Sequence, residues 1–473
     1  MRLSAHDASF LYGETTSGPM HATAVLVLEG HLSFQQVFDF FAARIHLVPR
    51  LRQKVAYVPF NVAHPKWVDD PDFDLSNHLL PHKVPPGTTL NEALDIAMKL
   101  GEPLLDRSRP LWLFYVLENV EDKTLVVQIS HHAFVDGATA VAMSTVLTDA
   151  ESDAEPPEPP EPWNPQPVPS DMTLWQEAIR EQAQNTVSAF QRGLPSMEMT
   201  GKVAALMARM AQPVMLAPWN AGAVGPQRRL EPLNYTLDEF KQLRKAIGGT
   251  MNDIALTAVV EGVARYMAYK GENTQGRQLR LMCPVNVRDE NDDPLDMSGN
   301  KVSGMFPILD ASPKPITERF DEVKAEMEGL KERDEAETMA YLQEVQPPIP
   351  PMAMTATRGV GTAFDPTLLA ARIPAPILPN TGNRPQQAGF NFTFTNVMGP
   401  PWTQYIAGHE VLNSYAALML SGNLGLGASL ASFNGIMTFS FTVDPRLLPD
   451  VEVLRDYVAE AFSELQALAE TSE

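Results

Sequence analysis

Two patterns of apolar and polar positions alternate over the first 150 residues of the chain. Runs rich in β-branched and aromatic residues are typical of strands, whereas apolar residues recurring every three or four positions are typical of amphipathic helices. Together they predict an α/β layered architecture. The predicted strands cover residues 20–30, 111–118 and 124–130, and the predicted helices cover 34–45, 90–101 and 137–147.

Residues 151–171 interrupt this alternation with an acidic, proline-dense segment. Such a composition favours an extended, solvated linker. Two helical patterns follow it, over residues 172–191 and 196–211. Residues 151–225 are therefore predicted to be a linker with crossover helices between two domains.

A second α/β series occupies residues 226–473, so the chain is predicted to contain two α/β domains, the first over residues 1–150. The predicted strands of this series are 230–237, 279–287, 302–309, 388–397, 411–420, 426–433 and 435–443. The predicted helices are 238–248, a long helix from residue 250, a charged helix over 316–338, and 451–468.

Charge and cysteine content narrow the possible functions. The formal net charge is −22, which argues against a nucleic-acid-binding protein, because such a protein needs a basic face to displace phosphate counterions. Cys283 is the single cysteine, which excludes an intramolecular disulfide and a cysteine-rich metal site, and which fits a reducing cytoplasm. No apolar run has the length of a membrane span, and the first residues lack a signal-peptide pattern.

The strongest chemical signal is the segment His131-His132-Ala133-Phe134-Val135-Asp136-Gly137, which follows a predicted strand. Histidine suits general-base catalysis near neutral pH, and Gly137 would allow a tight turn. The alternative is structural: a core histidine and an aspartate that caps the next helix. A metal site would need a third ligand, and none stands at ligand spacing.

Three further segments contain candidate functional or structural residues. They are Pro110-Leu111-Trp112, Asn252-Asp253, and Thr395-Asn396 before a Gly-Pro-Pro turn. Taken alone, the second could be a helix cap and the third a turn.

Together these segments resemble the HHxxxDG, PLW, ND and SNVPGP-type motifs of the bacterial wax ester synthase/diacylglycerol acyltransferase family, within the CoA-dependent acyltransferase superfamily. Met398 stands where that family has proline. The resemblance runs over nearly the whole chain. It implies two chloramphenicol-acetyltransferase-like domains with the active site at their interface, and acyl-CoA as a substrate with no separate cofactor.

The resemblance also implies residue roles. His132 is the expected general base, with His131, Asp136 and Gly137 completing the catalytic motif. Asp136 is expected to pair with Arg288, a structural role. Pro110, Leu111 and Trp112 are expected to be structural too, and Asn252, Asp253, Thr395 and Asn396 to contact the oxyanion or substrate. No covalent acyl-enzyme is expected, since no G-x-S-x-G segment is present.

The implied partners are fatty acyl-CoA, a long-chain alcohol and diacylglycerol, with peripheral association with a membrane or lipid droplets. Residues 195–219, rich in methionine, and the apolar residues 346–380 are the predicted lipid-facing stretches. Two alternatives stay open: a condensation-type enzyme that uses a carrier-protein thioester, and a non-catalytic lipid-binding protein. The HxxxxD spacing of glycerolipid acyltransferases is also met, but their later acidic-Gly-Thr-Arg motif is missing.

Overall fold

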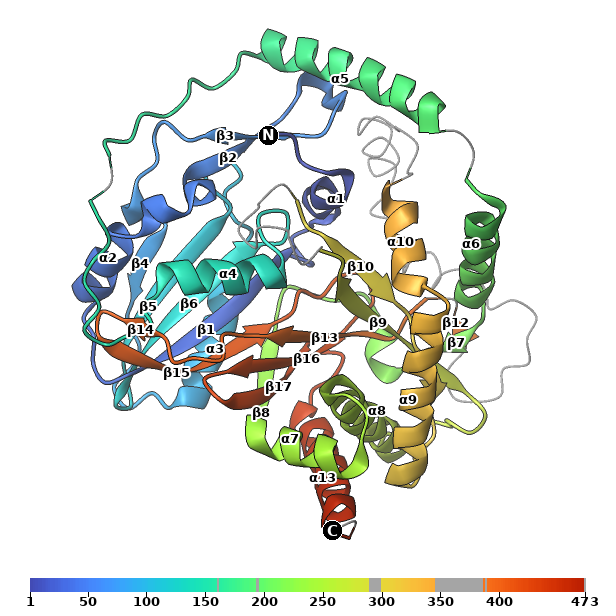
Figure 1. Ribbon diagram of the computed structural model, residues 1–473. Coiled ribbons are helices and arrows are strands. Elements are labelled where there is room, and N and C mark those ends of the chain that lie inside the picture. The colour runs from blue at the N-terminus through green and yellow to red at the C-terminus, as the bar shows by residue number, and fades with distance from the viewer. Residues whose placement is uncertain (160, 193–194, 289–298, 345–385, 388, 472–473) are drawn as a thin grey trace.

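The computed structural model describes residues 1–473 except 160, 193–194, 289–298, 345–385, 388 and 472–473. It contains two large sheets with helices packed on them (Figure 1). The first is six-stranded in the order β14-β15-β1-β6-β5-β4, with β4 and β5 parallel and the other pairs antiparallel. Its strands are β1 (His21–Glu29), β4 (Leu79–His82), β5 (Trp112–Val120), β6 (Lys123–His131), β14 (Tyr405–Ile406) and β15 (His409–Ala417).

The helices beside this sheet begin where the sequence provides caps. Ser33 and Thr89 each form a capping box with the residue three positions later, which satisfies backbone N–H groups that the first helical turn leaves free. The four helices are α1 (Ala5–Gly13), α2 (Phe34–Ala42), α3 (Leu90–Leu100) and α4 (Gly137–Leu147). A two-stranded sheet of β2 (Gln53–Ala56) and β3 (Lys66–Asp69) lies beside the N-terminus, where the Trp67 N–H donates to Met1 O (Figure 1).

The second sheet has the order β10-β9-β13-β16-β17-β8, and β11 also pairs with β9. Its central strands alternate between aromatic residues that pack on helices and small polar residues such as Ser440 and Thr442 on the other face. The strands are β8 (Arg229–Thr236), β9 (Gln278–Asn286), β10 (Val302–Met305), β11 (Ile308–Asp310), β13 (Phe392–Met398), β16 (Leu426–Phe433) and β17 (Ile436–Val443).

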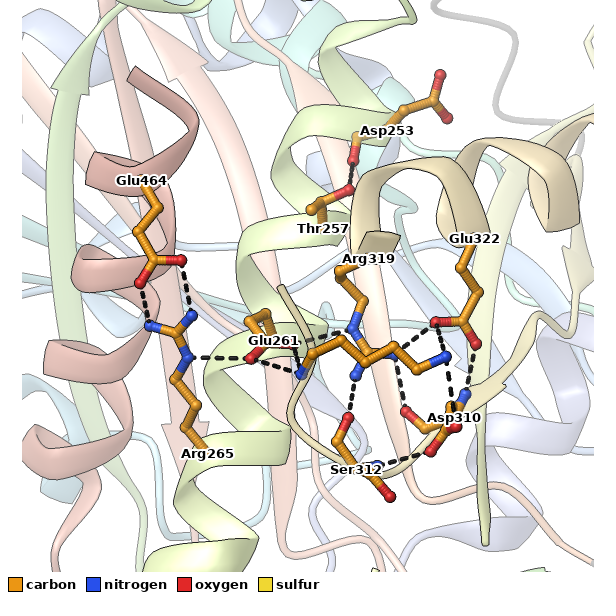
Figure 2. Close-up of polar contacts among 10 residues, drawn as sticks. Asp253, Thr257, Glu261, Arg265, Asp310, Ser312, Arg319, Glu322 and Glu464 are labelled. Carbon is orange, nitrogen blue, oxygen red and sulfur yellow. Dashed lines mark hydrogen bonds and ion pairs between the residues drawn. The ribbon is translucent and has the colours of Figure 1, made fainter. Parts of the chain in front are cut away.

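Helices α7 (Leu237–Ile247), α8 (Met251–Tyr269), α9 (Ile316–Glu332) and α13 (Val451–Thr471) cover one face of this second sheet. A buried polar network joins three of them (Figure 2). Glu261 on α8 accepts hydrogen bonds from Arg319 on α9 and Arg265, each at 3.0 Å, and Arg265 reaches Glu464 on α13 at 2.8 Å. Because every charge is paired, this network can fix the helices in one arrangement.

Two predicted elements are each divided in the structure. The predicted strand 302–309 is two strands, β10 and β11, which pair with different parts of β9. The predicted helix 316–338 is α9 followed by α10 (Glu335–Glu344), because Asp334 between them adopts a left-handed φ of 49° that no helix interior accepts.

Two paired strands, β14 and β15, depart from the order of the chain. β15 follows β13 in sequence, yet it pairs with β1 in the first sheet, and the chain then returns to the second sheet at β16. The predicted boundaries at 150 and 226 stay a prediction, but residues 405–417 lie in the sheet formed by residues 1–150. The chain therefore passes between the two sheets twice, once between β13 and β14 and once between β15 and β16.

The segment between the two series begins without regular structure, as predicted. Helices α5 (Asp171–Arg192) and α6 (Met197–Met210) follow it, and β7 (Val214–Met215) pairs with β12 (Gln386–Gln387). Within the described ranges, no helix is both long enough and apolar enough to cross a membrane.

Candidate active site

The two histidines at the end of β6 have different surroundings. His131 is fully buried, and its Nδ1 accepts a hydrogen bond from the Ala133 N–H at 3.0 Å. Its Nε2 lies 3.4 Å from a carboxylate oxygen of Glu14. The lone pair of a neutral His131 is therefore occupied by the backbone, which makes it a poor base.

His132 offers a free ring nitrogen instead. Its ring stacks on Phe10 of α1, with the centroids 4.4 Å apart, and its buried Nδ1 has no hydrogen-bond partner in the part of the chain that is described. Backbone contacts hold the residue in place: its N–H donates to Met20 O at 2.8 Å, and its carbonyl accepts from Asn300 Nδ2 at 2.7 Å. An imidazole fixed in this way can accept a proton from a bound group.

Burial keeps this imidazole neutral. It lowers the pKa of His132 to about 4, and the neighbouring His6 and His131 act in the same direction, against the opposing effect of Asp136. A histidine with this pKa is unprotonated at physiological pH, so its lone pair is available.

Asp136 fulfils both of the roles that the sequence left open. Its Oδ1 caps α4 by accepting the Thr139 N–H at 2.9 Å, and its Oδ2 accepts from Arg288 Nη2 at 2.6 Å. The expected ion pair with Arg288 is thus present, and it links the motif in the first sheet to the end of β9 in the second. Both side chains are almost completely buried, so each charge depends on the other.

Gly137 is explained by close packing and not by the tight turn that we predicted, because its φ is not positive. A Cβ at this position would lie 3.2 Å from Cγ2 of Val397 on β13. The absence of a side chain therefore lets β13 of the second sheet approach the start of α4.

The Pro110-Leu111-Trp112 segment contacts His131 through the backbone. The Leu111 carbonyl accepts the His131 N–H at 3.0 Å, and Trp112, which is buried, donates from Nε1 to Leu51 O at 2.8 Å. These contacts fit the predicted structural role.

The remaining predicted residues divide into two groups. Asp253 forms a capping box with Thr250, and no contact joins Asn252 or Asp253 to His132 among the described residues. Thr395 and Asn396 precede Val397 on β13, and Thr395 lies on the same face of the strand as Val397, which packs on Gly137. Of the four, Asn396 has the clearest unused hydrogen-bonding group, because its Oδ1 is buried with no partner in the described ranges.

A small cavity adjoins the motif. Its walls come from α1, β3, the loop after β6, the first turn of α4 and the residues before β10, and are formed by Asp7, Trp67, Ala133, Phe134, Val135, Thr139, Gly299 and Asn300. Within the described ranges, no three His, Cys, Asp or Glu side chains are grouped so that they could hold a metal ion.

Comparison with known families identifies the chain. Residues 3–255 match the model of the wax ester synthase/diacylglycerol acyltransferase catalytic domain, and residues 298–466 match the model of the C-terminal domain of the same family. The chain belongs to this family. It is accordingly an acyltransferase.

Individual relatives agree with the assignment. A Mycobacterium tuberculosis protein named "Putative diacylglycerol O-acyltransferase" is 27% identical, over 98% of this chain and 90% of its own. The solved wax ester synthase/diacylglycerol acyltransferase from Marinobacter aquaeolei VT8 superposes with a TM-score of 0.67 at 19% identity, covering 99% of this chain and 100% of that chain. The first condensation domain of the calcium-dependent antibiotic synthetase reaches 0.61 at 12% identity, covering 98% and 97%. The predicted two-domain α/β acyltransferase fold is confirmed.

Two residues that contact the motif, Glu14 and Asn300, were not identified from the sequence. Glu14 is buried beside His131, and although burial raises its pKa, contacts with His131, Met20 and Arg107 lower it to about 2. Asn300 holds the His132 carbonyl. Neither residue belongs to a periodic pattern or a motif, so only the three-dimensional contacts identify them.

Proposed function

We propose that this protein transfers a fatty acyl group from acyl-CoA to the hydroxyl group of a long-chain alcohol or of diacylglycerol, with His132 as the general base. The products would be a wax ester and triacylglycerol. The observation that carries the proposal is the neutral, half-buried imidazole of His132, whose buried Nδ1 has no partner in the described part of the chain. The names of the relatives support the substrate class.

In the proposed reaction, the alcohol oxygen attacks the thioester carbonyl while His132 takes the hydroxyl proton. The tetrahedral intermediate collapses with cleavage of the C–S bond, and the protonated His132 returns its proton to the CoA thiolate. No covalent acyl-enzyme is needed, because a thioester is already an activated acyl donor. Cys283 is no alternative nucleophile, since burial raises its pKa to about 12 and keeps it a thiol.

Hydrogen-bond donors must stabilise the oxyanion of this intermediate. We keep Asn252, Asp253, Thr395 and Asn396 as proposed contacts with the substrate or the oxyanion. Asn396 has the best support, because its buried Oδ1 has no hydrogen-bond partner among the described residues. The carboxylate of Asp253 already accepts the Thr250 N–H at 2.8 Å, which supports a capping role instead.

Contact with a lipid surface is part of the proposal, because the acceptors are insoluble in water. In the predicted lipid-facing stretch 195–219, Met197 is 94% exposed and Met207 is 48% exposed, whereas Met215 is buried. The second predicted stretch, 346–380, lies outside the described residues. Flotation with phosphatidylcholine vesicles tests the association, and replacement of Met197 and Met207 by serine should reduce the bound fraction.

The reaction itself is tested by following CoA release from palmitoyl-CoA with hexadecanol, diacylglycerol or hexadecylamine as the acceptor. We expect release with the first two and ester products by chromatography. Preferential release with the amine would favour a condensation-type enzyme. Absence of release with all three would favour a non-catalytic lipid-binding protein.

A further inference from the structure

Glu14 follows helix α1 as its C-cap residue, and its side chain is enclosed beside the motif, with only 1% of its surface exposed. Its N–H donates to Phe10 O at 3.1 Å, and the ring of Phe10 stacks on the ring of His132. The end of α1 therefore supplies both the ring that packs on the proposed base and a buried carboxylate close to it.

The two carboxylate oxygens of Glu14 have separate partners. Oε2 accepts a hydrogen bond from Arg107 Nη2 at 2.8 Å, and the side chain of Arg107 is 34% exposed. Oε1 accepts the Met20 N–H at 3.0 Å and lies 3.4 Å from His131 Nε2. Because Arg107 balances the charge, the carboxylate can stay ionised in this buried position.

The contact with Met20 leads to the peptide group that precedes the His132 side chain. Met20 donates its N–H to Glu14 Oε1, and its carbonyl oxygen accepts the His132 N–H at 2.8 Å. Glu14 thus holds the residue that holds the backbone nitrogen of His132.

The contact with His131 leads to the peptide group that follows His132. Because His131 Nδ1 accepts the Ala133 N–H at 3.0 Å, the neutral ring carries its proton on Nε2. This proton faces the negative charge of Glu14 Oε1, which favours the tautomer that can accept from Ala133. One oxygen atom therefore acts on the peptide groups on both sides of His132.

We propose that Glu14 is a positioning residue for acyl transfer: through Met20 and His131, its Oε1 holds the two peptide groups that flank His132 and so orients the imidazole toward the substrate. This inference rests on the proposed role of His132 as general base. Glu14 itself is too enclosed to contact a substrate. Since a small misplacement of a reacting group can lower a rate about 100-fold, loss of Glu14 should lower kcat more than it changes KM.

The proposal is tested by the rate of CoA release from palmitoyl-CoA and hexadecanol by Glu14→Ala and Glu14→Gln. Glutamine keeps Oε1 and replaces Oε2 by an amide nitrogen, and because Met20 and His131 both present N–H donors, its oxygen should turn to them. We expect Glu14→Ala to lower kcat at least about tenfold, with KM for palmitoyl-CoA changed by less than about threefold. Glu14→Gln should retain kcat within about threefold of the wild type.

Asp444→Ala is the matched control. Asp444 has no exposed side-chain surface, and like Glu14 it accepts from a backbone N–H and an arginine, Gly225 N at 2.6 Å and Arg446 Nη2 at 2.7 Å. No contact joins it to the motif among the described residues. Its removal should therefore affect stability, with kcat within about twofold of the wild type.

The position of the His132 ring is measured without turnover by NMR of protein labelled with ¹³C-histidine. The His132 signal is identified by its absence from His132→Ala, and stacking on Phe10 should shift it by the ring current of the phenyl group. Glu14→Ala should reduce this shift, whereas Glu14→Gln and Asp444→Ala should preserve it.

Glu14→Asp replaces Glu14→Ala if the latter does not fold, as judged by circular dichroism, because a side chain one methylene shorter cannot keep both Arg107 and Met20 as partners. The proposal is overturned if the folded variant keeps the wild-type kcat or an unchanged His132 signal. It is also overturned if Glu14→Gln is as slow as Glu14→Ala, or if Asp444→Ala loses as much kcat. Failure of the proposed function would appear separately, as absent CoA release by the wild type while the His132 signal still responds to Glu14→Ala.

Discussion

The network around Glu261 and the motif around His132 both bury polar side chains, but they leave these groups in opposite states. In the first, Glu261 and Arg319 have no exposed side-chain surface, and they contact each other at 3.0 Å. Arg319 also donates to Asp310 O at 2.8 Å and to Glu322 at 2.7 Å (Figure 2). In the second, His132 Nδ1 and Asn396 Oδ1 are buried without partners among the described residues.

This contrast distinguishes polar groups that stabilise the fold from polar groups that are available to a substrate. A buried polar group without a partner costs about 1–3 kcal/mol, so a fold retains few of them. A saturated network has no free atom to offer a substrate, whereas an unpartnered imidazole can accept a proton. Removal of a paired buried group in either region should therefore lower stability, whereas removal of the unpartnered His132 imidazole should lower the rate.

The largest effect on stability is expected from Glu261→Ala. It leaves Arg319 buried without its partner, which should lower the free energy of unfolding by about 3–5 kcal/mol. Urea denaturation measures this loss. Glu464→Ala is the matched control from the same network, since Glu464 is 45% exposed and should cost less than about 1 kcal/mol. Equal losses in the two variants would show that the network is not the structural element described above.

A somewhat smaller effect is expected at the ion pair that joins the motif to the second sheet. Asp136→Ala and Arg288→Ala should each destabilise the protein by about 2–4 kcal/mol, since each leaves a buried charge. Asp136→Ala should cost slightly more because it also removes the cap at Thr139. In a double-mutant cycle the losses should not be additive, and additive losses would argue against direct pairing.

A still smaller effect is expected from Gly137→Ala. The new methyl group would approach Val397 Cγ2 at 3.2 Å, which should cost about 1 kcal/mol through displacement of β13. The same substitution should cost less in a Val397→Ala background, where the space is open. Thermal unfolding of the four proteins gives the comparison, and an equal cost in both backgrounds would exclude this contact as the reason for glycine.

The smallest change is expected in the pH dependence of catalysis. The base acts in its neutral form, and the pKa of His132 is lowered to about 4, so protonation removes activity only as the pH falls through that value. We expect kcat/KM to stay nearly constant from about pH 8 to pH 5 and then to decline, in proteins that remain folded. A decline centred near the ordinary histidine pKa of 6.5 would show that the imidazole is not desolvated as described.

Sequence patterns predicted most of the fold because its elements carry local signals. The helix over 137–147 was predicted with its observed bounds, since Asp136 is a strong N-cap and apolar residues follow it. The division of the charged helix at Asp334 was missed, because a left-handed residue other than glycine has no clear sequence signature. The placement of β15 beside β1 was missed because the pairing partner of a strand is a tertiary choice.

The candidate site was predictable only where motifs exist. The resemblance to the family supplied His132, Asp136 and Arg288, and the structure brings the last two into contact at 2.6 Å. Glu14 and Asn300 became visible only through contacts between residues distant in sequence. Histidine residues also look alike in a sequence, and only hydrogen bonding distinguishes the occupied Nδ1 of His131 from the free Nδ1 of His132.

The most direct test of the central claim is the rate of CoA release from palmitoyl-CoA and a lipid alcohol by His132→Ala, measured beside His131→Ala after both proteins are shown to be folded. Loss of the general base should lower the rate of His132→Ala by at least about 100-fold. His131→Ala should lose less, because the lone pair of His131 is bonded to the backbone. A folded His132→Ala protein that releases CoA at the wild-type rate would contradict the account.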